Sequence, residues 1–266
     1  EELSPPMVEA LHKLGGIPIK PILAESMQMG DENHTRQTAC DYIYDRLMLP
    51  ALFELDRPKK EIMKTVRYIV DTPRFFHCYG QAAARAALVA ADGTEYSTMV
   101  TAVCGNGVEF GIKIASLPGQ WFTAPAPMMK GRYTSSEFTE KDQLPWMGDS
   151  CVVECYGMGG FAAAASPIVC NLRGMTLKES IGQTKEMYRI TMEKNYNFPI
   201  PNLDFDFFPV GIDIRKVVAT GITPIINTGI AHKKAGIGQV GAGTVRAPLA
   251  CFEKALEAYC AKLGIE

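Results

Sequence analysis

The spacing of apolar residues along the chain changes near residue 93. Between residues 35 and 92 apolar positions recur at helical spacing, and Pro58 and Pro73 interrupt the pattern where one helix would give way to the next. Beyond Gly93, short stretches with a period near two alternate with turn residues, which is typical of strands. This change predicts an α+β fold, in which an all-helical subdomain is followed by a mixed α/β subdomain.

The same change sets the expected domain boundaries. We expect the helical subdomain to cover residues 34–92 and the mixed α/β subdomain to cover residues 93–266. Residues 1–33 contain a Ser-Pro-Pro loop before a short apolar segment. We therefore expect them to be a linker or the end of an N-terminal domain that this chain lacks.

Local signals place individual elements in the second subdomain. Asn106-Gly107 lies between two apolar stretches, and such a pair predicts a β-hairpin with a type I′ turn. Thr176 and Glu179 have the spacing of a capping box at the start of a helix. The expected elements are strands at 96–103, 108–115, 121–124 and 151–156, a polar surface loop at 128–145, and helices at 176–194, 213–219 and 248–263.

Composition excludes several classes of protein. The net charge of −2 argues against a nucleic-acid-binding protein, which would need a basic face to neutralise phosphates. No apolar run approaches the roughly 18 residues of a membrane span. The 8 cysteines are scattered among apolar neighbours in a chain that is too long to need disulfides, which predicts reduced thiols and a cytoplasmic location.

The segment at 221–248 combines many glycines with a few reactive side chains. Each glycine costs conformational entropy and packs nothing, so this density indicates that something approaches the backbone closely. Lys233 and Arg246 beside open backbone N–H groups favour an anion such as phosphate or a carboxylate, and His232 could act as a general base. The alternative is a pair of tight turns in a mobile surface loop.

Two acidic clusters could also carry chemistry. Asp31, Glu32 and His34 lie within a short segment before a helix, where they could act in acid–base catalysis, hold a divalent metal, or simply cap the helix. Asp149 precedes Glu154, which stands in an apolar segment and would need a partner if buried. If the two clusters serve one site, their carboxylates should converge within about 10 Å. Apart from the optional divalent metal, no cofactor is indicated.

A third, weaker signal is Gly157-Met-Gly-Gly160. It follows an expected strand and precedes an alanine-rich segment, in outline like the loop of a dinucleotide-binding fold. The full glycine spacing of that motif is absent, and Pro167 would cut the following helix short. His12 and His77, among hydrophobic neighbours, are expected to be structural.

Several of these motifs together resemble the YlbE/AllG family of bacterial proteins. The resemblance extends over nearly all of the chain from about residue 27 and rests on Met29-Gly-Asp-Glu-Asn-His34, Asn106-Gly107, Trp121-Phe-Thr-Ala-Pro125, Met147-Gly-Asp-Ser150, Glu154-x-x-Gly-x-Gly-Gly160, Gly211-x-Asp-Ile-Arg215 and the segment at 221–248. Family members are longer at the N-terminus, which implies that this chain corresponds to their C-terminal part.

The resemblance implies a function in purine and allantoin breakdown. The implied activity is that of an oxamate carbamoyltransferase subunit, which converts oxalurate and phosphate to oxamate and carbamoyl phosphate in company with an FdrA-type subunit and a carbamate kinase. The partners would then be an FdrA-type subunit, the ureido acid and phosphate, in a homo- or hetero-oligomer without nucleic acid or membrane.

Carbamoyl transfer needs anion sites, carbonyl-oxygen donors and a group that moves protons. On this basis the expected catalytic residues are His232, Asp149 and Glu154. The expected substrate- or anion-binding residues are Asn106, Gly159, Gly160, Asn227, Thr228, Lys233, Gly241, Gly243 and Arg246, and Asp31, Glu32 and His34 are further acid–base or metal candidates.

Two other functions fit the same sequence. The chain could be a non-catalytic scaffold or an anion-sensing subunit of an FdrA-containing complex. It could also be a nucleotide- or coenzyme-A-binding enzyme, as its two glycine clusters suggest. Replacing His232 or Arg246 should abolish turnover but not assembly in a catalytic subunit, whereas in a scaffold it should affect assembly or nothing. Thermal stabilisation by adenine nucleotides would favour the third function.

Overall fold

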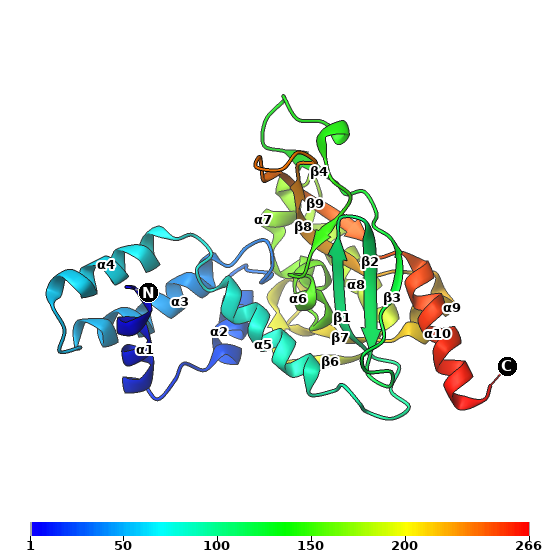
Figure 1. Ribbon diagram of the computed structural model, residues 1–266, viewed down its shortest axis with the longest axis horizontal. Helices are drawn as coiled ribbons and strands as arrows, with labels where there is room; N and C mark the ends of the chain where they lie inside the picture. The colour runs from blue at the N-terminus through cyan, green and yellow to red at the C-terminus, as the bar shows by residue number, and fades with distance from the viewer. Residues whose placement is uncertain (1, 266) are drawn as a thin grey trace.

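Helices make up the N-terminal part of the chain in the computed structural model, which describes residues 2–265. Figure 1 shows a helical lobe that projects from an α/β body, so the α+β class is confirmed. The helices of this part are α1 (Ser4–Lys13), α2 (Ile19–Gln28), α3 (Thr38–Phe53), α4 (Lys59–Asp71) and α5 (His77–Val89). Helices α2 and α5 join the lobe to the body, because α2 packs on strand β6 (Thr191–Ile200) and α5 packs on strand β1 (Val100–Asn106).

Helices α1 and α2 lie within residues 1–33, which we expected to be a linker or the end of an N-terminal domain. Pro6 and Ala10 of α1 are buried, and α1 packs on α3 and α4. A proline is tolerated in the first turn of a helix, where its missing N–H would have no partner, so Pro5-Pro6 begins α1 instead of marking a loop. Residues 4–28 thus contain two packed helices, while the division of the chain into subdomains stays a prediction.

Strand β1 pairs with β2 (Glu109–Ile114) in an antiparallel hairpin, as predicted. The sheet continues to β3 (Phe122–Pro125) on one side and β5 (Met147–Gly148) on the other, in the order β3-β2-β1-β5. The turn is not of type I′, because Gly107 has a positive φ of 83° but Asn106 does not. Asn106 instead accepts hydrogen bonds at Oδ1 from the N–H groups of Val108 and Glu109.

A second sheet has the order β4-β9-β8 and a third pairs β6 with β7. The strands of the second sheet are β4 (Lys130–Tyr133), β8 (Ile225–Ala231) and β9 (Gln239–Arg246). In the third sheet, β7 covers Asp206–Ile212. The expected surface loop at 128–145 was therefore partly wrong, because it contains β4. This strand is polar and largely exposed, so it lacks the alternating apolar residues by which a strand is predicted from sequence.

The glycines of the second sheet permit its strands to approach closely. A Cβ atom on Gly243 would lie 2.2 Å from the carbonyl oxygen of Lys130, and one on Gly131 would lie 2.2 Å from that of Ala242. A Cβ on Gly241 would lie 2.5 Å from the carbonyl oxygen of Arg132. We expected something to approach the backbone of the glycine-rich segment closely. In the structure, the neighbouring strand β4 does so.

Residues 152–155 form a helix where we expected a strand at 151–156. Helix α6 (Val152–Cys155) is followed by a buried 3₁₀ helix (Gly159–Ala165), so no strand precedes Gly157-Met-Gly-Gly160 as a dinucleotide-binding loop would require. The run is apolar and short, and periodicity cannot distinguish a buried helix of that length from a buried strand. Helix α7 (Pro167–Leu172) comes next.

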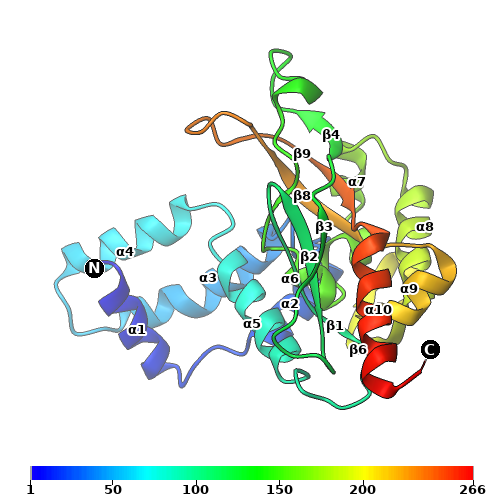
Figure 2. The ribbon, with the colours of Figure 1, turned by 45° about the vertical axis from the view of Figure 1, so that its right-hand side comes forward.

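The remaining helices begin and end largely as expected. Helix α8 (Leu177–Met187) has the predicted capping box of Thr176 and Glu179, but the chain then turns into β6 instead of remaining helical to residue 194. Helices α9 (Ile214–Thr220) and α10 (Leu249–Leu263) both end at a left-handed glycine. Figure 2 shows α10 beside α9, and α10 also packs on β2 and β3.

Two predictions from composition can be compared with this fold. All of the cysteines are free thiols, as expected from their scattered positions. Between residues 2 and 265, none of the helices combines the length and the apolar character needed to cross a bilayer.

Candidate functional site

A polar cavity of about 340 Å³ lies where the helical lobe meets the body. The loop between α2 and α3, the start of α5, the turn before α6 and the β8–β9 hairpin all contribute to it. The lining residues are His34, Thr35, Pro73, Arg74, His77, Cys78, Ser150, Thr228, Gly229, Gln239 and Ala242. Of the sequence-predicted site residues, His34 and Thr228 line this cavity.

His34 lies between a carboxylate and a hydroxyl group. Its Nδ1 is 2.8 Å from Glu154 Oε1, and its Nε2 is 2.8 Å from Ser150 Oγ. His34 is 5% exposed and Glu154 is 1% exposed, so water screens their interaction weakly. Burial lowers the pKa of His34, but the charge and hydrogen bond of Glu154 more than offset this, and the pKa is raised above its ordinary value.

Glu154 is held by backbone groups as well as by His34. Its Oε1 accepts hydrogen bonds from the N–H groups of Gly160 and Asn227, both at 3.0 Å. Burial raises the pKa of Glu154, while His34 and these two N–H groups act in the opposite direction. All of the groups around Oε1 can donate, which favours the carboxylate and assigns the proton of the pair to Nδ1 of His34.

Gly159 allows the chain to pass directly over this pair. It has a φ of +59°, and a Cβ at this position would lie 2.1 Å from Glu154 Oε1 and 3.0 Å from His34 Cβ. Gly160 is similarly confined, since its Cβ would lie 2.2 Å from the carbonyl oxygen of Ile225. We expected both glycines to bind substrate or an anion, but the structure places them behind Glu154, where they position it.

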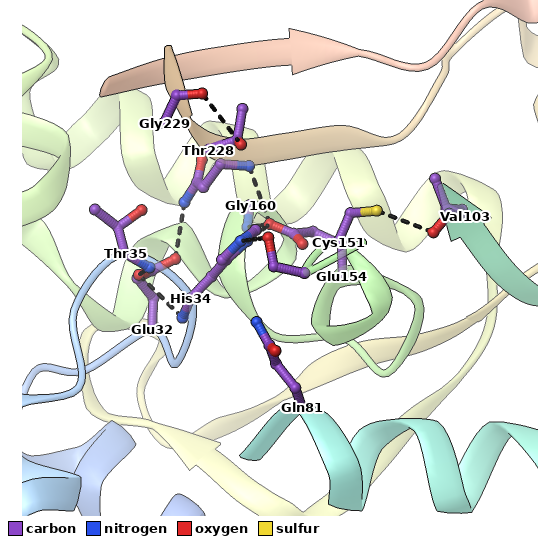
Figure 3. A network of polar contacts seen from close by, with 12 residues as sticks. Glu32, His34, Thr35, Gln81, Val103, Cys151, Glu154, Gly160, Thr228 and Gly229 are labelled. Atoms are coloured by element: carbon purple, nitrogen blue, oxygen red, sulfur yellow. Dashed lines mark hydrogen bonds and ion pairs between the residues drawn. The ribbon is translucent and has the colours of Figure 1, made fainter. Parts of the chain in front are cut away.

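Glu32 organises the loop that carries His34. Its Oε1 accepts hydrogen bonds from the N–H groups of His34, Thr35 and Arg36, and its Oε2 accepts one from Asn227 Nδ2 at 2.9 Å. Glu32 and Glu154 thus converge on Asn227, which is buried on β8. Figure 3 shows Glu32, His34, Thr35 and Glu154 in this network.

Arg173 extends the network to the cavity wall. Its Nη1 donates to Asn227 Oδ1 and its Nη2 donates to Thr35 Oγ1, the latter at 2.9 Å. Burial lowers the pKa of this guanidinium, and Glu32 acts in the opposite direction. Sequence reasoning missed Arg173, because it belongs to no recognisable motif and reaches the site only through the packing of α7.

Asp31 and Asp149 do not join Glu32 and Glu154. Asp31 Oδ2 accepts hydrogen bonds from the N–H groups of Ala39 and Cys40 at the start of α3, so it caps the helix, and burial raises its pKa to about 6. Asp149 is exposed on the turn before Ser150 and lines a neighbouring cavity. Asp31 thus has the capping position, and Asp149 the turn position, of the simpler alternative. The convergence of all four carboxylates within about 10 Å stays a prediction.

His77 is part of the cavity, although we expected it to be merely structural. Its ring stacks on that of His34, with centroids 6.1 Å apart and planes inclined by 14°. Gln37 and Gln81 contact its two ring nitrogens. Burial lowers the pKa of His77 to about 4, and the neighbouring His34 acts in the same direction, so His77 is neutral near pH 7.

The other predicted anion-binding residues are spread along the β8–β9 hairpin. His232 and Lys233 lie near its tip, where His232 contacts Phe138 and Lys233 Nζ donates to the carbonyl oxygen of Lys141. Arg246 lies at the opposite end of β9, where its Nη2 is 2.7 Å from Glu186 Oε2. The predicted common cavity for these side chains is wrong, because an extended strand separates them.

The remaining predicted residues have structural positions. Gly241 and Gly243 pack against β4, and Asn106 stabilises the turn between β1 and β2. Among residues 2–265, no group of three or more His, Cys, Asp or Glu side chains is placed to hold a metal ion. Ser150 belongs to the Met147-Gly-Asp-Ser150 motif, but its contact with His34 could not be inferred from sequence spacing.

Comparisons with known proteins identify the family. A family model described as oxamate carbamoyltransferase subunit AllG matches residues 1–150. The protein of that name from Escherichia coli (strain K12) is 42% identical over 265 residues, which are 99% of this chain and 63% of that protein. The uncharacterized protein YahG of the same strain is 39% identical over 261 residues, 98% of this chain and 55% of that protein.

A solved structure agrees with this result. The crystal structure of a conserved protein of unknown function from Enterococcus faecalis V583 matches with a TM-score of 0.93 and 39% identity over 97% of this chain and 62% of that one. The chain thus spans between about half and two thirds of the length of these relatives. With the family model matching more than half of the chain and two relatives close to 40% identical, this chain belongs to the AllG family.

Proposed function

We propose that this chain is a subunit of a carbamoyltransferase, which transfers the carbamoyl group of oxalurate to phosphate and releases oxamate and carbamoyl phosphate. Family membership supports the subunit role, since a relative that is 42% identical is named an oxamate carbamoyltransferase subunit. The reaction centre that we propose is the cavity around His34, and not the tip of the β8–β9 hairpin around His232.

The buried pair of His34 and Glu154 is the observation that carries this proposal. Transfer of a carbamoyl group between oxygen and nitrogen requires a proton to leave the attacking group and to reach the departing amide nitrogen. His34 presents Nε2 toward the cavity, and Glu154 stabilises the imidazolium that forms when Nε2 takes up a proton. The pair can therefore move a proton in both directions within one turnover.

The cavity wall also offers groups suited to the substrates. Arg74 is an exposed cation on the wall, and its planar guanidinium matches a carboxylate or phosphate. Thr35 adds a hydroxyl group that can donate to a carbonyl oxygen. Thr228 adds a second hydroxyl, which can turn from its long 3.5 Å bond to the carbonyl oxygen of Gly229 to do the same. We propose Arg74 for the anionic end of a substrate and these hydroxyls for the ureido group, whereas Glu32, Asn227 and Arg173 hold the loop in place.

We further propose that activity requires an FdrA-type partner subunit. The cavity lies at the meeting of two parts of the chain and is open to the surface. The chain spans less than two thirds of its curated relatives, and we propose that a partner subunit supplies further groups to the site. The metal and nucleotide options are not part of this proposal.

The test is phosphate-dependent formation of carbamoyl phosphate from oxalurate by the full-length protein, with and without its FdrA-type partner. His34→Gln should lower kcat by about 10²- to 10⁴-fold, the usual contribution of general acid–base catalysis. His12→Gln is the matched control, because His12 is exposed on α1 outside the cavity. Full activity of His34→Gln, or equal losses in both variants, would refute the proposed centre.

The same assay separates the alternatives. His232→Gln should leave turnover nearly unchanged if the centre lies at His34, and should abolish it if the hairpin tip is catalytic. A scaffold would retain turnover in every variant that still assembles with its partner. An enzyme for adenine nucleotides or coenzyme A would be stabilised thermally by those ligands, which the proposed carbamoyltransferase would not be.

A further inference from the structure

Ser150, His34 and Glu154 form a line of three side chains that ends at the cavity. Ser150 comes from the turn before α6, His34 from the loop between α2 and α3, and Glu154 from α6 itself. Both links in the line are 2.8 Å long. A hydroxyl, an imidazole and a carboxylate in this order match the arrangement that activates a serine nucleophile, which is recognised by geometry and not by chain order.

The protonation of this line favours activation of the hydroxyl. Glu154 Oε1 receives N–H groups from Gly160 and Asn227 and therefore acts as an acceptor toward His34 Nδ1–H. With the ring proton on Nδ1, Nε2 carries a lone pair directed at Ser150 Oγ. Ser150 O–H is then the donor, and its proton has a defined path to the imidazole.

Ser150 is also accessible to a substrate. It is only partly buried and lines the cavity together with Thr35 and Thr228. A serine that served only to orient His34 would not need to face an open cavity. His77 stacks on the His34 ring and is neutral, and its two ring nitrogens contact Gln37 and Gln81. It therefore confines the imidazole without competing for the Ser150 proton.

We propose that Ser150 is the nucleophile of the reaction and carries the carbamoyl group as a covalent intermediate. This inference rests on the proposed function and specifies its route. Ser150 Oγ attacks the ureido carbonyl carbon and passes its proton to His34 Nε2. The bond from that carbon to the departing nitrogen breaks, the nitrogen takes the proton from His34, and oxamate leaves with a carbamoyl ester on Ser150.

Phosphate completes the second half of the reaction. An oxygen of hydrogen phosphate attacks the carbamoyl carbon of the ester, and the bond from that carbon to Ser150 Oγ breaks. His34 takes the proton of the phosphate and returns it to Ser150 Oγ. The products are carbamoyl phosphate and the regenerated serine, so no oxidant, reductant or further reactant is needed. The two substrates can then use the same space in turn.

Isotope exchange distinguishes this route from direct transfer. The full-length protein with its partner subunit is incubated with oxalurate and ¹³C-labelled oxamate in buffer from which phosphate has been removed enzymatically. A covalent intermediate forms without phosphate, so label should enter oxalurate at a rate comparable with turnover. Direct transfer requires phosphate for the first bond to break, so label should then remain in oxamate.

A mass measurement locates the intermediate. Acid quenching of the same mixture should add about 43 Da, the mass of a carbamoyl group replacing hydrogen, to the peptide that contains Ser150. Ser150→Ala should lose exchange, adduct and at least about 10³-fold of turnover, a loss on the scale of removing a triad member. Ser136→Ala is the matched control, since Ser136 is exposed in the loop after β4.

The outcomes separate this inference from the proposed function. Carbamoyl phosphate formation without exchange or adduct, or exchange that persists in Ser150→Ala, would overturn the serine route and leave the carbamoyltransferase intact. A complex that makes no carbamoyl phosphate would refute the proposed function itself. Should Ser150→Ala fail to assemble, Ser150→Thr keeps the hydroxyl and the hydrogen bond, and the wild-type exchange still decides between the routes.

Discussion

His34 Nδ1 lies 2.8 Å from Glu154 Oε1, although the two residues are 120 positions apart in the chain. One comes from the loop at the edge of the helical lobe and the other from α6 inside the body. The contact is buried on both sides and gains further support from Gly160 and Asn227. Docking of the lobe on the body therefore assembles the proposed proton-transfer pair. A small change at this junction should lower the rate of catalysis more than it lowers the stability of the fold.

Glu154→Gln should lower kcat by about 10³- to 10⁴-fold, because a neutral amide neither fixes the His34 tautomer nor stabilises the imidazolium. The sign of the accompanying pH effect follows from the pKa of His34, which Glu154 raises. Removing that charge while burial persists should lower this pKa. The acidic limb of the kcat/KM profile should consequently move to lower pH in the variant.

The pH profile of kcat/KM checks this prediction and can be paired with a titration of the His34 ring by nuclear magnetic resonance. Glu109→Gln is the matched control, since Glu109 is exposed on β2. An acidic limb at the same pH in Glu154→Gln and in the wild type would mean that the group titrating in the profile is not His34.

Arg246→Lys should change turnover little. Arg246 pairs with Glu186 at the end of β9, and the two side chains are 49% and 31% exposed. An ion pair this exposed contributes at most about 1 kcal/mol, and lysine retains its charge. The expected result is an unchanged Michaelis constant for the ureido acid and for phosphate in steady-state assays. A selective rise in the constant for the ureido acid would restore Arg246 as a carboxylate-binding residue.

The helices and hairpins that could be predicted depend on residues close together in the chain. The change of period near Gly93, the capping box at Thr176 and the Asn106-Gly107 hairpin all act within a few residues, and each corresponds to an observed element. The short apolar run at 151–156 could not be assigned in this way, because a buried helix of one turn and a buried strand share the same lack of periodicity.

The candidate site could be predicted only in part, for a related reason. The sequence marked His34, Glu32, Glu154 and Asn227 as able to do chemistry, since residue type alone carries that information. It could not show that Ser150 would meet His34, because this contact joins positions 116 apart and depends on how the lobe docks. The sequence also could not show that strand β4, and not an anion, would occupy the space beside Gly241 and Gly243.

Gly243→Ala should destabilise the protein by about 2 kcal/mol, within the range for overpacking a rigid site. The added Cβ would lie 2.2 Å from the carbonyl oxygen of Lys130, and backbone atoms cannot move away as a flexible side chain could. Thermal or denaturant unfolding measures the loss. Gly182→Ala is the control: it lies in α8 with no atom within 4 Å of the added Cβ, and it should gain about 0.5–1 kcal/mol.

Phosphate protection distinguishes the two explanations for these glycines. If Gly243 serves strand packing, phosphate should shift the unfolding midpoint of Gly243→Ala and of the wild type by the same amount. A loss of phosphate protection in the variant alone would instead indicate an anion bound at the β8–β9 hairpin.

Gly159→Ala should impair activity more than stability. Its φ of +59° disfavours alanine by about 1 kcal/mol, and the added Cβ would also lie 2.1 Å from Glu154 Oε1. Gly15→Ala is the matched control, with a φ of +69° and no atom within 4 Å of the added Cβ, so it carries the conformational cost without the collision. Glu154 Oε1 must move away to relieve this collision, which should weaken its hydrogen bond to His34, whereas the rest of the 3₁₀ helix can remain packed. Unfolding free energies and kcat measured on both variants isolate the effect of the collision. Equal losses of stability with full kcat in Gly159→Ala would show that the position of Glu154 does not control the reaction.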